Sequence, residues 1–171
     1  KNLKNLNKIT FIEKCKENVG ELPNITKKQD IIIDSMGWTS HLGGIKNPKL
    51  DLKLNLDSHL YFLENLKNNL KNNCLVIYLG STGQYGKSDT NFVNENSQMI
   101  PLDVQGINKA ATDDYFRVYS NLYKLNVVSL RIPNCYGQNQ PLFGKDIGLI
   151  GEFIRSALLN KNFVIYGKNR R

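Results

Sequence analysis

The sequence predicts an α/β fold built on a parallel β-sheet, and two features carry this prediction. Residues 31–34 (IIID) and 75–79 (LVIYL) are short, mostly apolar runs, which are typical of parallel strands buried on both faces. A third such run lies at 127–130, and segments with helical spacing separate the three. Strands that alternate with helices in this way predict a doubly wound parallel sheet.

The amino-terminal half supplies two predicted strands and one long helix. Residues 9–12 form an apolar run that predicts a strand, and residues 38–49 are polar and contain glycine, which predicts a loop. Leucines at helical spacing then predict a helix with one face packed on the sheet. These leucines are Leu52, Leu56, Leu60, Leu63 and Leu70.

The carboxyl-terminal half continues the alternation. Residues 87–100 are mostly polar and predict an irregular loop that Pro101 ends. The next helix has an apolar stripe that predicts its core-facing side. The stripe consists of Ile107, Ala111, Tyr115, Val118 and Leu122. Residues 152–160 predict a further helix and residues 163–167 a short strand.

The length and composition are consistent with one ordinary domain, and they exclude few classes of function. The 171 residues carry a formal net charge of +8. A basic balance is compatible with nucleic acid or a phosphorylated ligand. No basic stripe interleaved with aromatic residues supports nucleic-acid binding, so we interpret the lysines as solvated surface.

Cysteines, histidines and apolar runs narrow the class further. Three widely spaced cysteines predict reduced thiols in a cytosolic protein. Neither His41 nor His59 has a carboxylate or cysteine at ligand spacing, so no metal site is expected. No apolar run approaches the roughly 18 residues of a membrane span. The sequence therefore predicts a soluble, cytoplasmic protein.

Polar residues gather at two places that the predicted fold brings together. Ser81 and Thr82 lie in a glycine-containing loop at the carboxyl end of a strand, which is where open α/β sheets bind ligands. Gln105 and Lys109 are four residues apart, so they share one face of the helix after Pro101.

Three segments resemble the NAD-dependent epimerase/dehydratase family, the extended short-chain dehydrogenases that act on nucleotide sugars. Residues 80–86 (GSTGQYG) resemble the family's phrase around its catalytic serine or threonine. Residues 101–109 resemble its YxxxK helix, and residues 130–137 (LRIPNCYG) resemble its LRxxNVYGP segment. One position departs from the family: Gln105 stands where the family has its catalytic tyrosine.

The resemblance implies a Rossmann-like fold that is present in part. The sequence lacks the family's opening strand, its GxxGxxG turn, which holds a pyrophosphate at a helix N-terminus, and most of its substrate domain. We therefore expect residues 1–171 to be a single partial NAD(P)-binding domain whose substrate-binding part starts at about 133. The chain is expected to be a fragment of a longer enzyme or a product without the pyrophosphate cradle.

The resemblance also assigns catalytic roles. In the family, NAD or NADP takes a hydride from the sugar while a tyrosine takes the hydroxyl proton; here Ser81 would donate to the sugar oxygen and Lys109 would hold the nicotinamide ribose. A carboxamide does not titrate near neutral pH. Gln105 therefore positions water or substrate while another residue, for which Tyr85 is a candidate, is the base, or the protein binds its ligand without redox chemistry.

The resemblance implies further contacts. In the family, a pair of residues that includes an aspartate meets the adenine, and Lys14 and Cys15 stand in its place here. Asn55 matches an asparagine that holds the central strands and the active-site geometry, with a solvated asparagine as the alternative. The implied cofactor contacts are Ser35, Met36, Gly37, Asn55, Lys109 and Pro133, and the implied substrate contacts are Ser81, Thr82 and Asn134.

Three function classes stay open. The first is a nucleotide-sugar epimerase or reductase, the second a catalytically inactive nucleotide-sugar binding protein of the same fold, and the third a nucleic-acid-binding module supported by charge alone. A 4,6-dehydratase is disfavoured because Thr82 and Gly83 replace that group's Asp-Glu pair. A homodimer is allowed by the resemblance, because family members often pair through the helices that correspond to 52–70 and 104–123.

Overall fold

The computed structural model describes residues 26–88, 92–140, 142–143 and 147–163. The predicted strand at 9–12, the pair at Lys14 and Cys15, and all but the first residue of the predicted strand at 163–167 lie outside the described residues. Statements below concern the described part of the chain.

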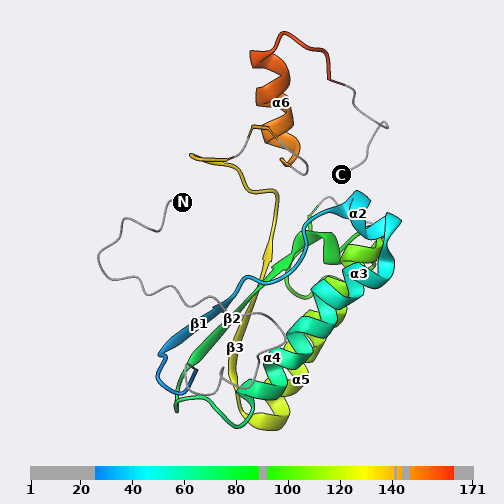
Figure 1. The fold of residues 1–171 in the computed structure, drawn as a ribbon. Helices are drawn as coiled ribbons and strands as arrows, with labels where there is room; N and C mark the ends of the chain where they lie inside the picture. The colour runs from blue at the N-terminus through cyan, green and yellow to red at the C-terminus, as the bar shows by residue number, and fades with distance from the viewer. Residues whose placement is uncertain (1–25, 89–91, 141, 144–146, 164–171) are drawn as a thin grey trace, which may run out of the picture.

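Three parallel strands form the sheet, in the order β1-β2-β3 (Figure 1). Their bounds are Ile31–Asp34 for β1, Leu75–Ser81 for β2 and Asn126–Ile132 for β3. Ile33 pairs with Ile77, which in turn pairs with Val128. The predicted parallel sheet is therefore confirmed, and all three strands end at the same edge.

Helices line one face of this sheet and its strand-end edge (Figure 1). The α-helices are α2 (His41–Lys46), α3 (Pro48–Leu52), α4 (Ser58–Leu66), α5 (Val104–Tyr123) and α6 (Leu149–Leu158). A π-helix, η2 (Lys53–Asp57), joins α3 to α4, and a 3-10 helix, η3 (Thr82–Gln84), follows β2. The long helices α4 and α5 run side by side along the sheet, whereas α2 and α6 lie near the edge where the strands end.

The segment 38–49 was predicted as a loop, and this prediction is wrong. The Ser40 side chain accepts a hydrogen bond from the Gly43 amide and starts α2. The Asn47 side chain caps α3 in the same way, with Pro48 at the first helical position. Both are strong helix-start signals, and they outweigh the glycines. The last helix likewise begins at Leu149, three residues earlier than predicted.

The core lies between the sheet and the two long helices. Its buried members are Phe62, Leu63, Leu66, Val76, Tyr78, Phe116 and Leu125. Tyr78 of β2 stacks on Phe116 of α5, with 4.7 Å between ring centroids, a geometry that adds to the apolar burial. Of the predicted leucine stripe, Leu63 is fully buried but Leu52 is 48% exposed, so that stripe was only partly right.

Helix α5 turns its predicted apolar stripe away from the core. Ile107 is 54% exposed and Leu122 is 67% exposed, whereas Gln105 and Lys109 on the other face are buried. The predicted orientation was therefore wrong. Polar side chains can be buried when each finds a hydrogen-bond partner, and the inward side chains of α5 find such partners.

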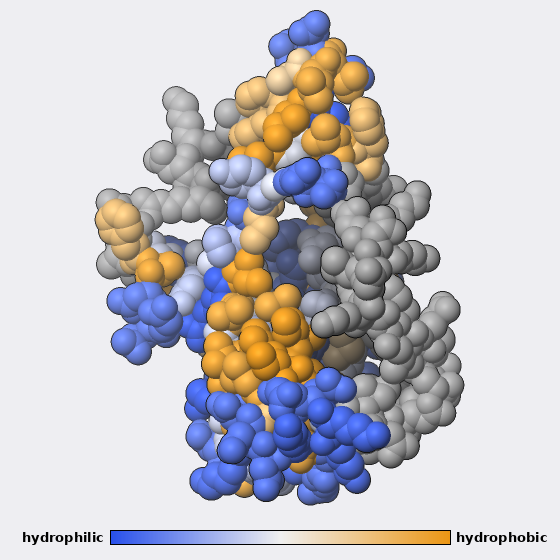
Figure 2. Space-filling view, turned by 90° about the vertical axis from the view of Figure 1, so that its left-hand side faces the viewer, coloured by the Kyte–Doolittle hydropathy of each residue, from blue (hydrophilic) through white to orange (hydrophobic). Residues whose placement is uncertain are grey.

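The sheet face opposite the helices is apolar and open. Figure 2 views the molecule from this side and shows an apolar band at its centre. Ile31 and Ile33 of β1 and Val128 and Leu130 of β3 are exposed there. The sequence predicted burial on both faces; the described residues cover one. Within the described ranges, no helix has the length and apolar character to cross a membrane.

Candidate active site

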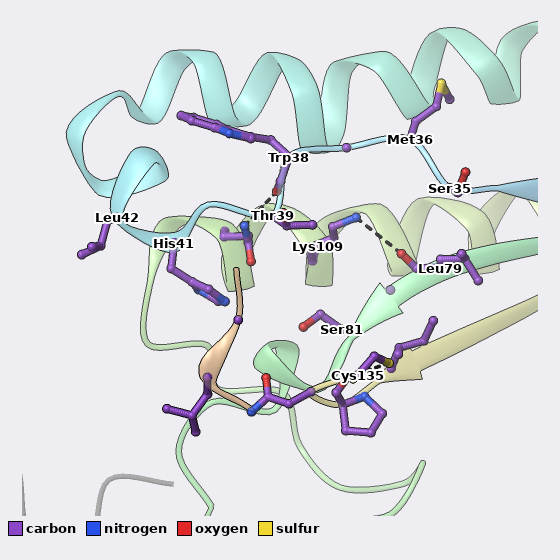
Figure 3. Close-up of a pocket in the computed structure, with 18 of the residues that line it drawn as sticks. Ser35, Met36, Trp38, Thr39, His41, Leu42, Leu79, Ser81, Lys109 and Cys135 are labelled. Carbon is purple, nitrogen blue, oxygen red and sulfur yellow. Dashed lines mark hydrogen bonds between the residues drawn. The ribbon is translucent and has the colours of Figure 1, made fainter. Parts of the chain in front are cut away.

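A cavity of about 520 Å³ opens at the carboxyl ends of the three strands (Figure 3). Its walls come from the loop after β1, the end of β2, the first turns of α5, the segment after β3 and the start of α6. Parallel α/β sheets bind ligands at this edge. The cavity is therefore the candidate active site.

Most of the site residues predicted from the sequence line this cavity. They are Ser35, Met36, Gly37, Ser81, Gln105, Lys109, Pro133 and Asn134. Asn55, Thr82 and Tyr85 are not among the lining residues. The fold thus brings together segments that are up to about a hundred positions apart in the chain.

The Lys109 side chain extends from α5 to the cavity. It is 7% exposed, its Nζ donates to the Leu79 carbonyl at 3.4 Å, and it lies 5.3 Å from the centroid of the Tyr78 ring. Burial lowers the pKa of Lys109, and the carboxylates of Asp34 and Asp51 partly oppose this shift. The ammonium therefore has unused donors beside the β2 strand end.

Ser81 ends β2 and caps the 3-10 turn after it. Its Oγ accepts from the Gly83 amide at 3.1 Å, which leaves its O–H free to donate to a ligand. The Ser81 amide donates to Gln84 Oε1 at 2.8 Å, and Gln84 Nε2 donates to Asp113 Oδ2 at 2.9 Å. Asp113 also accepts from Arg131 Nε at 2.9 Å. This buried chain of hydrogen bonds holds the serine loop against α5 and β3.

Gln105 and Asn55 together fix the backbone of Trp38. Gln105 Nε2 donates to the Trp38 carbonyl at 2.8 Å. Asn55 Nδ2 donates to the same carbonyl at 2.9 Å, and Asn55 Oδ1 accepts from the Trp38 amide at 2.8 Å. Asn55 is fully buried, so the solvated alternative is wrong. Both amides hold the loop after β1 in place.

Gly37 allows the chain to pass between Asn55 and Lys109. Its φ of +127° is a backbone conformation that other residues rarely adopt. A Cβ at this position would lie 2.6 Å from Asn55 Oδ1 and 3.0 Å from Lys109 Nζ. The exit from β1 therefore requires glycine, and the bare backbone leaves room beside the ammonium.

Tyr85 does not reach the cavity, and the suggestion that it replaces the missing tyrosine gains no support. The side chain is buried, and its hydroxyl accepts from Arg131 Nη1 at 2.9 Å. The Arg131 guanidinium also lies over the Tyr85 ring, 5.0 Å from the centroid. Tyr85 packs behind the serine loop. Thr82 likewise does not line the cavity.

Both histidines have carboxylate partners that their sequence spacing did not reveal. His59 Nδ1 lies 2.6 Å from Asp34 Oδ2 in the core, and His41 Nδ1 lies 2.6 Å from Asp103 Oδ2 at the cavity. His41 and Asp103 are 62 positions apart, so their spacing gives no sign of the contact. The sequence marks Asp103 alone, as a possible helix cap after Pro101. In the described ranges, no group of three or more His, Cys, Asp or Glu residues could hold a metal ion.

Comparison with known proteins gives a family match and partial relatives. The model of the NAD dependent epimerase/dehydratase family matches residues 1–171. A dTDP-4-dehydro-6-deoxyglucose reductase from Escherichia coli is 35% identical over 111 residues, which is 64% of this chain and 34% of the reductase.

Solved structures agree with the family match. The UDP-N-acetylglucosamine 4-epimerase from Methanobrevibacter ruminantium M1, in complex with UDP-N-acetylmuramic acid, has a TM-score of 0.82 at 26% identity, over 93% of this chain and 50% of the epimerase. The UDP-glucose 4-epimerase from Thermus thermophilus, in complex with NAD, has a TM-score of 0.74 at 24% identity, over 87% and 47%. This chain spans about half the length of these proteins, or less.

Proposed function

Because the chain belongs to the NAD dependent epimerase/dehydratase family, we propose that it contributes part of an enzyme that moves a hydride between NAD or NADP and a nucleotide-sugar carbon. The observation that carries this proposal is the placement of Ser81 and Lys109 in one cavity at the strand-end edge. We assign the chain to a partial NAD(P)-binding domain, with residues from about 133 starting the substrate side.

The cavity residues fit the nicotinamide end of such a dinucleotide. Gly37 presents bare backbone beside the Lys109 ammonium, where the diol of a ribose would accept its hydrogen bonds. Ser35, Met36 and Pro133 also line the cavity. When bound, the dinucleotide supplies the hydride acceptor or donor.

The remaining side chains would receive the sugar. The free O–H of Ser81 donates to the reacting sugar oxygen, and Asn134, which also lines the cavity, offers an amide. The charge of Lys109 is balanced in part by nearby carboxylates. Its ammonium places a positive charge near the sugar hydroxyl oxygen, which becomes more negative as its proton leaves. Gln105 keeps Trp38 in place and transfers no proton.

The test is dinucleotide binding and hydride transfer by the natural protein that contains this chain. NAD and NADP are titrated by calorimetry, and nicotinamide absorbance is followed with UDP-, dTDP- and CDP-sugars. Lys109→Met is expected to weaken dinucleotide binding about tenfold, because a charge-assisted hydrogen bond contributes about 1.5 kcal/mol or more. Lys53→Met, on the exposed surface of η2, is the matched control and should bind normally.

Two results would count against this function. Absence of dinucleotide binding would contradict it outright. Binding without hydride transfer would favour the alternative, a catalytically inactive nucleotide-sugar binding protein, which the engagement of the Gln105 amide with Trp38 favours. Gln105→Tyr in that case separates the two: a gain of hydride transfer would indicate an otherwise intact site.

We infer that two copies pair through the outer face of the helix layer. Ile107, Val118 and Leu122 expose an apolar stripe along α5, and Leu52 and Tyr61 are exposed on the adjacent helices. An exposed apolar surface of this kind is typical of protein interfaces. The expectation that nucleic acid is not a partner stays a prediction. Net charge is the one sequence feature that favours nucleic-acid binding.

A further inference from the structure

We propose that His41, oriented by Asp103, is the acid–base group of the cavity and takes over proton transfer from the position that Gln105 occupies. This inference rests on the proposed function, because it names the group that exchanges a proton with the sugar hydroxyl. It uses two residues that neither the motifs nor the family resemblance singled out.

The tyrosine position itself cannot supply the proton chemistry. Gln105 is 4% exposed and its Nε2 donates to the Trp38 carbonyl. A carboxamide does not change its charge near neutral pH. Tyr85 is tied to Arg131 outside the cavity. If the cavity performs a hydride transfer coupled to proton transfer, the proton requires another side chain.

Among the described residues that line the cavity, three carry titratable side chains: His41, Lys109 and Cys135. Lys109 is buried and donates to the Leu79 carbonyl. The Cys135 thiol donates to the Pro133 carbonyl at 3.3 Å. Histidine is the residue type whose ordinary charge change falls in the physiological range and which commonly acts as general acid and base. His41 is therefore the candidate.

Asp103 fixes the imidazole in one orientation and one tautomer. Its Oδ2 lies 2.6 Å from His41 Nδ1, and its Oδ1 accepts from the Gly106 amide at 2.7 Å. A carboxylate can only accept a hydrogen bond, so the hydrogen in this contact is on Nδ1 of His41. In the neutral imidazole, Nε2 is then the acceptor. Asp103 also caps α5, so the pair is anchored to the helix that carries Gln105 and Lys109.

His41 and Ser81 line the same cavity. Both lie close to Gly83, because a Cβ built on this glycine would be 3.3 Å from Ser81 Oγ and 3.9 Å from His41 Cε1. In Figure 3, the His41 ring extends into the cavity and the Ser81 hydroxyl points to the same side. A substrate hydroxyl between them could donate to Nε2 and accept from Ser81.

The His41 side chain is 54% exposed, which leaves this edge open to a ligand. The groups around it are the Asp103 carboxylate from the start of α5, the serine loop through Gly83, and Lys109 across the cavity. The location of His41 in the cavity that also contains Ser81 distinguishes this pair from one that only caps a helix, and the experiment therefore measures proton transfer.

In the proposed step, the O–H bond of the sugar hydroxyl breaks, its proton bonds to Nε2 of His41, and its electron pair becomes the second bond of the new carbonyl. The hydride from the same carbon goes to the oxidised nicotinamide that the proposed function supplies, so the sugar is oxidised and the dinucleotide reduced. Asp103 stabilises the imidazolium that results, and the reverse step returns the proton.

The test combines kinetics with nitrogen NMR of the imidazole in the natural protein that contains this chain. We expect His41→Ala to lower turnover about a hundredfold, the usual contribution of a positioned acid–base group, with dinucleotide affinity unchanged. Added imidazole should restore part of this loss, because the site is exposed. Lys46→Gln, on the surface of the same helix α2, is the control and should retain normal turnover and no imidazole response.

Asp103→Asn tests the orienting role without removing the helix cap, because asparagine caps as well as aspartate. We expect turnover to fall about tenfold and the proton of His41 to redistribute from Nδ1 to both nitrogens in the NMR spectrum. Circular dichroism checks that each variant is folded.

NMR decides the proposal even if the protein transfers no hydride. Addition of UDP-glucose and NAD to the unaltered protein is expected to shift the Nε2 resonance of His41. An unmoved Nε2 resonance with bound ligand would overturn the proposal while leaving the proposed function intact. Full turnover in folded His41→Ala, or a loss that imidazole does not restore, would overturn it as well.

Discussion

The two long faces of α5 are not divided into an apolar inner and a polar outer side, as they are on a typical helix packed on a core. Beside the core residue Phe116, the inward face carries Asn108, Lys109, Thr112 and Asp113, which are polar and at most 7% exposed. On the outer side, the stripe that includes Leu122 is apolar and open to solvent. On this helix, polarity therefore does not indicate which face is buried.

Each inward polar side chain is paired with a neighbouring segment. Asn108 Nδ2 donates to Asp51 Oδ1 at 2.8 Å, and Thr112 Oγ1 donates to the Asn55 carbonyl at 2.6 Å. These bonds join α5 to α3 and η2, and the Asp113 bonds join it to the serine loop. Buried hydrogen bonds of this kind favour one arrangement of the segments that they join, and here that arrangement positions the cavity walls.

The largest effect is expected from breaking the inward network at Asp113. Asp113→Ala leaves Arg131 and the Gln84 amide without their carboxylate, and removal of one partner from a buried ion pair costs about 3 kcal/mol or more. Urea unfolding would measure the loss.

The neighbouring Asp114 provides a matched control for that prediction. It is exposed and pairs with Arg117 one turn later, and such surface pairs contribute at most about 1 kcal/mol. Equal losses for Asp114→Ala and Asp113→Ala would show that the inward network has no special weight.

Substitution on the outward face should act on association and leave the fold alone. Leu122→Asp puts a charge into the exposed stripe, and we expect it to weaken dimerisation about thirtyfold, or ~2 kcal/mol. Sedimentation equilibrium would measure the association.

Asn121→Asp adds the same charge to an exposed neighbouring position and should affect pairing less. If the unaltered protein sediments as a single chain, the proposed pairing through the exposed apolar stripe of α5 is contradicted.

The smallest effect concerns the pH dependence of stability at Lys109. Because burial lowers the pKa of this lysine below its ordinary 10.5, the unfolded chain binds the proton more tightly than the folded one. The free energy of unfolding therefore carries a penalty at neutral pH, and the penalty is relieved as pH rises through the lowered pKa toward 10.5. We expect Lys109→Met to be more stable near neutral pH, by about 1.4 kcal/mol for every tenfold loss of proton affinity that burial causes.

The difference between Lys109→Met and the unaltered protein should narrow in alkaline solution, as urea unfolding at several pH values would show. Lys53→Met, at an exposed position, should show no narrowing. A difference that stays constant with pH would mean that the Lys109 charge does not limit stability.

Much of the fold and part of the site could be predicted from local pattern. The apolar runs located all three described strands, and glycine with serine after β2 marked the ligand edge. The spacing of Gln105 and Lys109 placed both on the same cavity wall. In contrast, the two short helices that start after Ser40 and Asn47 were predicted to be a loop. A helix cap is a signal of a single residue, whereas helical periodicity is a signal of several residues and is easier to recognise.

By itself the sequence determined the parallel strands, the family and the pair of Ser81 and Lys109, because these depend on contiguous runs and fixed spacings. Only the tertiary structure decided which face of α5 is buried, since an amphipathic pattern separates two faces without saying what covers either. It also decided that His41 meets Asp103. Contacts between residues 62 positions apart arise from how the helices dock on the sheet, and no local propensity encodes them.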